Sequence, residues 1–204
     1  GTAQQVLKLS IATTLPGAHN AQNTVAAYAA CRVMGLAAAQ IADGICSYPG
    51  LPHRQQVVGI IDGVAYVNDS KATNAEAAAK ALACYGDIYW IAGGREKDGG
   101  YDLLPPCFPH VRHAFLIGEA AKSMEKQFGD TLTTTVSGDL ATALTAAMAL
   151  AKAEGARRPV ILLSPACASF DQFANFEDRG NAFIDLVCNL PGTDRKIFVE
   201  KGAA

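Results

Sequence analysis

Several features are absent from this chain, and each absence excludes a class of protein. Its 17 basic and 19 acidic residues are interspersed and give a net charge of −2, so we expect neither nucleic acid nor another polyanion as a partner. No apolar run approaches the roughly 18 residues of a membrane-spanning helix. The first residues lack a basic segment followed by an apolar block, so we expect no signal peptide.

The chain also lacks the signatures of several enzyme classes. It contains no G-x-x-x-x-G-K-[ST] phosphate loop and no H-E-x-x-H metal motif, and its four histidines are scattered. The turn Gly93-Gly94 lacks the third glycine of a dinucleotide fingerprint. The motifs in this sequence therefore predict no complete catalytic centre.

Cysteine usage indicates a reducing compartment. None of the six cysteines forms a C-x-x-C pair or lies beside a histidine cluster, and most have apolar neighbours. We expect free buried thiols, a cytoplasmic protein and no zinc site.

The chain divides near a segment rich in proline and glycine. Its 204 residues suffice for one large domain or for one domain with a piece of another, and half of them are apolar, which is enough to form a core. The stretch 48–54 carries two prolines and a glycine, which is typical of a linker. Residues 1–54 are too few to build a core of their own. We therefore expect residues 1–54 to be the end of one domain and residues 55–204 to form a second.

Apolar strands alternate with helical segments through the second part. Asp62-Gly63 between two apolar runs predicts a β-hairpin. Continuous apolar strands separated by helices predict an α/β fold, a Rossmann-like and mostly parallel sheet covered by helices on both faces. The strands are expected at 55–61, 64–67, 88–92, 113–117, 132–136, 160–163 and 196–199, and the helices at 20–34, 37–46, 75–82, 119–128, 139–153 and 171–189.

The run Asn68–Asn74 (NDSKATN) is the most informative local feature. It places an acid, a lysine, two hydroxyls and two amides where a strand passes into a helix. A helix N-terminus offers unpaired N–H groups and partial positive charge, so this composition favours an anion site. The alternative is a simple capping box formed by Thr73 and Glu76. A cap requires neither Lys71 nor Asp69, and those two residues favour a site.

Two further strand-to-helix junctions reach the same sheet edge if the crossovers are right-handed. Residues 93–98 place Lys97 four positions beyond a strand, although lysines in such turns are usually solvated. Residues 164–172 contain Ser169, which either binds a ligand or forms an S-x-x-Q capping box. Phe170, Phe173 and Phe176 either wall a pocket or belong to an ordinary helix core. In such sheets, ligands bind beyond the carboxyl ends of the strands.

Two polar residues in the first part also deserve a functional interpretation. Asn20, in the run Leu15–Asn20 (LPGAHN), is most simply a helix cap. Arg54, beside the linker, either reaches a phosphate across a domain cleft or is solvated.

Together these segments resemble the Mur ligases. The resemblance rests on 68–74, on Gly93-Gly94-x-x-Lys97, on 163–173 (LSPACASFDQF) and on 176–180 (FEDRG), with 15–20 and 51–54 in the same order. It covers nearly the whole chain. The serine-proline-alanine-cysteine-alanine-serine run favours the D-glutamate-adding branch over its siblings.

The resemblance implies an ATP-dependent amide-forming ligase that adds D-glutamate to UDP-N-acetylmuramoyl-L-alanine through an acyl phosphate. It places residues 1–54 in the central ATP-binding domain and 55–204 in the amino-acid-binding domain. The phosphate loop and the main magnesium sites then lie outside these residues, so the chain alone is expected to be inactive. By position, D-glutamate contacts Lys71, Thr73, Lys97, Ser169, Phe170 and Phe176, and ATP contacts Asn20, Arg54 and Asp69. Phe170 stands where the family pattern has leucine, which weakens the role of its side chain and leaves its backbone N–H available.

Two alternatives remain at this point. One is a different Mur ligase or a folylpolyglutamate synthase, against which the run 164–173 argues. The other is a non-catalytic Rossmann-like binding module. Convergence of Lys97 and Thr73 on one pocket would argue against the module, whereas both side chains turned to solvent would favour it.

Overall fold

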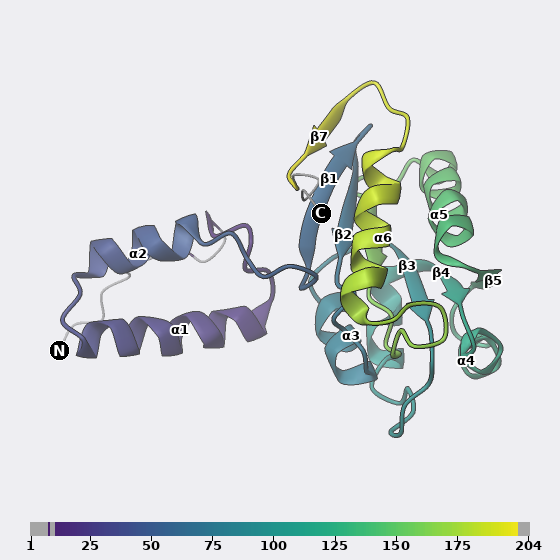
Figure 1. The fold of residues 1–204 in the computed structure, drawn as a ribbon, viewed down its shortest axis with the longest axis horizontal. Helices are drawn as coiled ribbons and strands as arrows, with labels where there is room; N and C mark the ends of the chain where they lie inside the picture. The colour runs from purple at the N-terminus through teal and green to yellow at the C-terminus, as the bar shows by residue number, and fades with distance from the viewer. Residues whose placement is uncertain (1–7, 9–10, 200–204) are drawn as a thin grey trace. The chain divides into compact units, whose positions relative to one another are not determined.

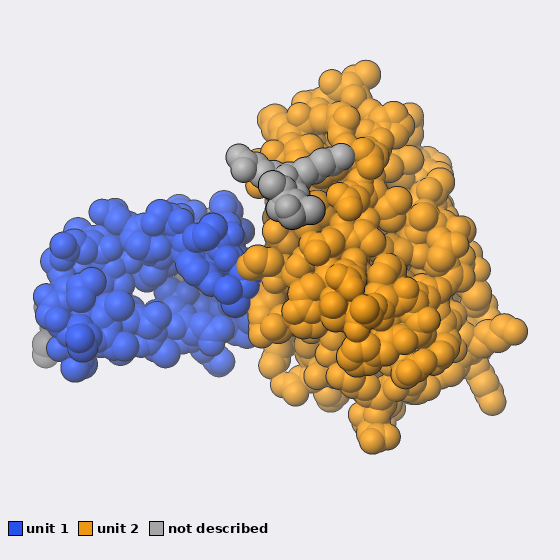
Figure 2. Space-filling model, viewed as in Figure 1, with its two compact units in different colours: residues 1–51 blue, residues 52–204 orange. Residues whose placement is uncertain are grey.

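The computed structural model describes residue 8 and residues 11–199. The chain forms two compact units, residues 1–51 and 52–204 (Figure 2). Residues 1–7 and 9–10 of the first expected domain, and 200–204 of the second, lie outside the described residues. The assignment of 1–54 and 55–204 to two functional domains stays a prediction.

The described part of the first unit contains two α-helices with almost no core. Helix α1 (Ala18–Val33) buries none of its residues, and α2 (Ala38–Ser47) buries only Ile41. The expected cap at Asn20 is wrong, because α1 begins at Ala18 and its N-cap position is Gly17. The Asn20 amide instead donates to the carbonyl of Pro16 at 2.7 Å.

The second unit is built on one seven-stranded sheet with the order β5-β4-β3-β6-β2-β1-β7 (Figure 1). The ladders β2·β6, β6·β3, β3·β4 and β4·β5 are parallel, whereas β1 pairs antiparallel with β2 and β7. The strands are β1 (Gln56–Ile61), β2 (Val64–Asn68), β3 (Ile88–Gly93), β4 (Val111–Ile117), β5 (Thr134–Gly138), β6 (Val160–Leu163) and β7 (Arg195–Ile197). The predicted hairpin and the mostly parallel sheet are therefore confirmed.

Helices cover both faces of this sheet. Trp90 packs among buried residues of α3 and α4, whereas its neighbours Tyr89 and Ile91 pack among those of α5 and α6. All three are fully buried, as the unbroken apolar run of this strand requires. The helices are α3 (Ala75–Leu82), α4 (Ala121–Phe128), α5 (Leu140–Glu154) and α6 (Phe176–Cys188), with a 3₁₀ segment η2 (Pro105–His110) that the sequence did not predict.

The strand register brings the three polar junctions together. Leu163, the last residue of β6, is opposite Asn68 of β2 on one side and Ile91 of β3 on the other. The Asp69 N–H donates to the Leu163 carbonyl at 2.7 Å. The segments that follow β2, β3 and β6 therefore begin side by side at one edge of the sheet.

Glycine is required where two of these junctions meet. Gly94 has a φ of 131°, and a side chain there would collide with the Ala168 carbonyl. The backbones pass close enough for Arg95 and Ala168 to exchange two main-chain hydrogen bonds of 2.9 Å. The double glycine thus allows the β3 junction to approach the β6 junction.

The two capping boxes that the sequence offered as alternatives at this edge do not form. Helix α3 is capped by Asn74, whose side chain accepts from the Ala77 N–H, and not by Thr73. Helix α6 begins only at Phe176 with Asn175 as its cap. Residues 171–175 are therefore not helical, in contrast to the helix expected at 171–189. Each asparagine carbonyl reaches the N–H three residues ahead, which is the ordinary geometry of an N-cap. The hydroxyls of Thr73 and Ser169 are therefore not used as caps.

Two broader expectations are also answered. No disulfide joins cysteines in the described chain, but of the six thiols only Cys167 is buried and Cys46 is exposed. Apolar neighbours in the sequence therefore led us to expect more buried thiols than the structure has. Among the described residues, no helix is both long and apolar enough to cross a membrane.

Candidate functional site

Lys97 and Thr73 meet although they come from different junctions. The Lys97 Nζ donates to the Thr73 Oγ1 at 3.3 Å. Lys97 extends from the loop after β3, and Thr73 lies in the turn between β2 and α3. Lys97 is exposed and Thr73 is half-buried, so the pair lies at the surface and is open to a ligand. The two side chains are not turned separately to solvent.

Lys71 and Phe176 form a second contact beside this pair. The Lys71 Nζ lies 4.6 Å from the centroid of the Phe176 ring, a cation–π geometry. The hydroxyl of Ser70 donates to the main-chain carbonyl of Phe176 at 2.7 Å, which fixes the start of α6 against the β2 junction. A second ammonium group is thereby positioned at the same sheet edge.

Ser169 and Phe170 differ sharply in exposure. Ser169 is buried, and it follows Ala168, which pairs with Arg95 in the loop that carries Lys97. The Phe170 side chain is 61% exposed, so it does not form a buried wall. Phe173 lines a different cavity, described below. Of the three expected aromatic walls, Phe176 places its ring against the ammonium group of another expected site residue, Lys71.

Arg179 is a buried cation that the sequence reasoning did not assign to the site. Its Nε donates to the Ser70 hydroxyl at 3.0 Å, and its Nη2 donates to the carbonyls of Ser70 at 2.9 Å and Cys167 at 3.2 Å. Its Nη1 has no acceptor among the described residues. Burial lowers the pKa of Arg179 to about 10, and Cys167 and Asp171 oppose this shift.

A signal for this arginine was present in the sequence. Position 179 shares a helix face with Phe183 and Val187, both of which are buried. An arginine at a core position of an amphipathic helix requires internal acceptors. The polar run 68–74 is the segment that supplies two of them.

The three residues expected to contact ATP differ in their surroundings. Asp69 is buried, and its carboxylate accepts from the Ser164 hydroxyl at 2.8 Å and from the Gln55 N–H at 3.1 Å. Burial raises the pKa of Asp69 to about 7, although these two hydrogen bonds and the charge of Arg54 act in the opposite direction. Arg54 is exposed near this carboxyl, whereas Asn20 belongs to the other unit. Their roles toward ATP stay predictions.

Several groups at this edge can donate hydrogen bonds to a carboxylate. Two ammonium groups, a buried guanidinium and the hydroxyls of Thr73 and Ser169 are contributed by adjoining junctions. Charge-assisted hydrogen bonds from such groups are the strong interactions available to a carboxylate. The described residues contain no group of three or more His, Cys, Asp or Glu side chains that could hold a metal ion.

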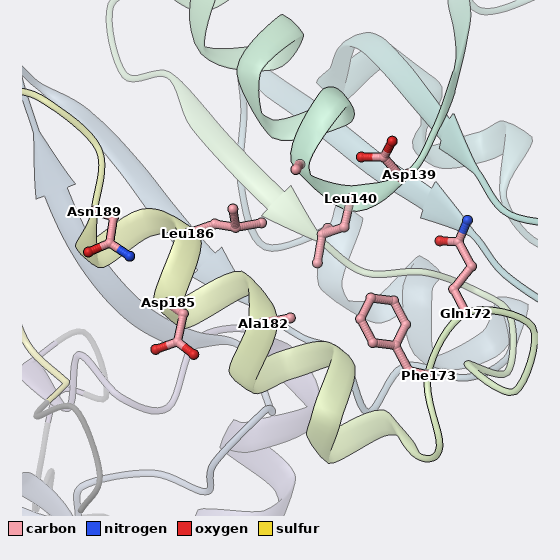
Figure 3. A pocket seen from close by; sticks show the side chains of 9 residues that line it. Asp139, Leu140, Gln172, Phe173, Ala182, Asp185, Leu186 and Asn189 are labelled. Carbon is pink, nitrogen blue, oxygen red and sulfur yellow. The ribbon is translucent and has the colours of Figure 1, made fainter.

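A separate cavity of about 710 Å³ lies between the start of α5 and one side of α6 (Figure 3). Leu140, Phe173 and Leu186 contribute apolar surface, and Asp139 and Asp185 contribute carboxylates. None of the nine expected substrate or ATP residues lines it. We therefore place the candidate site at the sheet edge where the segments after β2, β3 and β6 begin, and not at this cavity.

Comparisons with known proteins show which family the chain is similar to. No protein-family model matches the chain. It is 50% identical over 193 residues to the UDP-N-acetylmuramoylalanine–D-glutamate ligase of Rhodospirillum rubrum, which covers 95% of this chain and 40% of that protein. It is 46% identical over 202 residues to the ligase of the same name from Agrobacterium fabrum, covering 99% of this chain and 43% of that protein. The chain belongs to the Mur ligase family.

The structural likeness and the coverage set the scope of that identification. The fold is similar to that of a UDP-N-acetylmuramate–alanine ligase from Thermotoga maritima, with a TM-score of 0.57 and 12% identity over 85% of this chain and 38% of the other. At this identity the match supports the Mur ligase fold alone. The chain spans about 40% of the length of the first relative and 43% of the second.

Proposed function

We propose that this chain supplies the D-glutamate-binding part of an ATP-dependent UDP-N-acetylmuramoylalanine–D-glutamate ligase, an enzyme of peptidoglycan synthesis in the cytoplasm. The identity of about 50% to ligases of that name supports the reaction. Because the chain spans only part of those relatives, the remaining length is proposed to bind UDP-N-acetylmuramoyl-L-alanine and to supply the phosphate and Mg²⁺ sites. Residues 55–204 are proposed as the amino-acid-binding domain and 1–54 as the end of the ATP-binding domain.

One observation carries the proposal, the contact between Lys97 and Thr73. A dianionic amino acid requires cations and hydroxyls at both of its carboxylates. Lys97, Lys71 and the two hydroxyl residues Thr73 and Ser169 meet that requirement from three chain segments. We propose that they fix D-glutamate so that its amine faces the acyl phosphate of the partner substrate.

We also propose that the backbone N–H of Phe170 binds D-glutamate and that the Phe176 ring forms an apolar side of the site. Asn20, Arg54 and Asp69 are proposed to contact ATP when the two units are joined to the rest of the enzyme. Holding both reactants in one orientation is the main contribution that such residues make to the rate.

The rival functions are disfavoured by specific observations. Another Mur ligase or a folylpolyglutamate synthase does not account for the identity to D-glutamate ligases along almost the whole chain. A non-catalytic binding module is disfavoured by the same identity to ligases.

Substitution of Lys97→Ala in the full-length ligase tests the proposal. We expect the KM for D-glutamate to rise about 10- to 100-fold, because a charged hydrogen bond contributes roughly 1.5–3 kcal/mol. The KM for ATP and the melting temperature should change little. Lys126→Ala, which removes an exposed lysine on α4, is the matched control. An unchanged KM for D-glutamate in Lys97→Ala would refute the proposed role.

A further inference from the structure

The loop that carries Lys97 has little internal restraint. Residues 95–100 are all exposed. Gly99 and Gly100 have φ values of 110° and 59°, and a side chain on either would meet open space. Glycines in such conformations leave the chain many accessible states. The position of Lys97 must therefore be fixed by contacts outside the loop.

Three side chains around α4 supply those contacts. Arg95 donates to Glu119 through Nε and Nη2, both at 3.0 Å, in a bidentate ion pair. On the helix itself, the Ser123 hydroxyl donates to Glu96 at 3.2 Å. The Gln127 amide donates to Asp102 at 3.4 Å.

The spacing of these contacts makes them one continuous restraint. Positions 119, 123 and 127 are four residues apart, so the two on α4 lie on the same helix face and Glu119 precedes them in the turn. Their partners at 95, 96 and 102 lie on both sides of Lys97. The loop is thus attached to α4 at its beginning and at its end.

Glu119 also joins this loop to the segment of Ser169. Its main-chain N–H donates to the Asp171 carboxylate at 3.0 Å, while its own carboxylate holds Arg95. The next N–H, that of Ala120, donates to the Gly94 carbonyl at 2.8 Å. Gly118 makes room for this arrangement, because a side chain there would collide with Asp171. A single turn before α4 therefore fixes two of the three junctions that build the candidate site.

We propose that Glu119 is a positioning residue that holds Lys97 in its substrate-binding orientation through the ion pair with Arg95. This inference rests on the proposed D-glutamate site. Glu119 does not touch the substrate. It reduces the conformational freedom that the Lys97 loop loses when D-glutamate binds.

The test is a double-mutant cycle in the full-length ligase with Glu119→Gln, Lys97→Ala and the double variant. Glu119→Gln removes the charge and keeps the main-chain bond to Asp171, so the fold is retained. We expect it to raise the KM for D-glutamate about two- to fivefold, the size of effect expected for an exposed ion pair, with kcat and the KM for ATP unchanged. In the Lys97→Ala background the same change should have no further effect.

Two further variants make the result specific. Arg95→Gln removes the same ion pair from its other partner and should reproduce the effect of Glu119→Gln. Glu76→Gln removes another exposed ion pair, that with Lys80 on α3 at 2.8 Å, and should leave the KM unchanged.

The outcomes separate this inference from the proposed function. If Lys97→Ala raises the KM but Glu119→Gln behaves like Glu76→Gln, the positioning role is overturned and the site stands. Additive effects of Glu119→Gln and Lys97→Ala also overturn it. If Lys97→Ala leaves the KM unchanged, the proposed site itself fails.

Discussion

Arg179 binds both the hydroxyl and the main-chain carbonyl of Ser70, which lies 109 residues earlier in the sequence. The same guanidinium reaches the Cys167 carbonyl. One side chain of α6 therefore connects the β2 junction to the β6 junction. The planar fork of arginine suits this task because its donors are held in fixed directions.

We therefore predict that Arg179→Lys destabilises the chain by on the order of 2–4 kcal/mol. A lysine keeps the charge but presents it at one point, so it leaves buried acceptors of Ser70 and Cys167 unpaired. Urea denaturation of the 204-residue chain measures the difference. Arg158→Lys, at an exposed position, is the control and should remain within about 0.5 kcal/mol of the parent. Equal stability of the two variants would contradict the bridging role of Arg179.

Much of the fold could be predicted because its signals are local. The Asp62-Gly63 turn specifies the hairpin, and the apolar runs of β3 and β6 specify buried parallel strands. Once the strands are parallel, the three polar junctions must share an edge. This topology places the loop of Lys97 and the run 68–74 at the same edge of the sheet.

The missing details depend on contacts that no local pattern encodes. Thr73 and Asn74 are both good caps, and the backbone selects Asn74. Ser169 does not begin α6, and the Gln172 amide donates to the Gly138 carbonyl at 2.8 Å instead of closing a capping box. Glu119 reads as an ordinary surface acid until the loop of Arg95 is placed beside it. Long-range packing decides each of these positions.

Asp69 gives the stability of the chain a distinctive pH dependence. Burial raises its pKa from 3.8 to about 7, so the folded state retains the proton longer than the unfolded state does. By linkage, the contribution of Asp69 to stability falls as pH rises from about 4 to 7, and is constant above that range. We predict that Asp69→Asn removes this component. Denaturation between pH 5 and pH 8 should show a smaller loss of stability with rising pH in the variant than in the parent.

A control with the opposite sign is available in the same sheet. The Asp62 carboxylate accepts hydrogen bonds from Asp194 and Thr193, which lower its pKa. The stabilising contribution of the Asp62 carboxylate is present above its unfolded pKa and is lost as pH falls. Asp62→Asn should therefore change the dependence of stability on pH in the acid range.

Identical pH profiles for Asp69→Asn and the parent would show that Asp69 does not titrate as its burial implies.

We predict that the purified 204-residue chain has neither ligase nor ATPase activity. Phosphoryl transfer requires a phosphate cradle and metal ligands. The sequence has no phosphate loop, and its described residues gather no metal-binding group. Phosphate release and product formation should both equal those of a blank without protein. ATP-dependent condensation of D-glutamate by this chain alone would overturn the proposed division of functions.

We predict that the chain binds D-glutamate weakly, with a Kd in the millimolar range, about −4 kcal/mol. The lysines that would hold its carboxylates are exposed, so water competes for both partners of each ion pair. The loop of Lys97 must also lose conformational freedom on binding. A titration monitored by amide chemical shifts should perturb the residues around Thr73, Lys97 and Ser169. Lys97→Ala should reduce these shifts, and Lys126→Ala should not. Tight binding, or shifts confined to Asn20 and Arg54, would place the ligand elsewhere and contradict the assignment of this sheet edge.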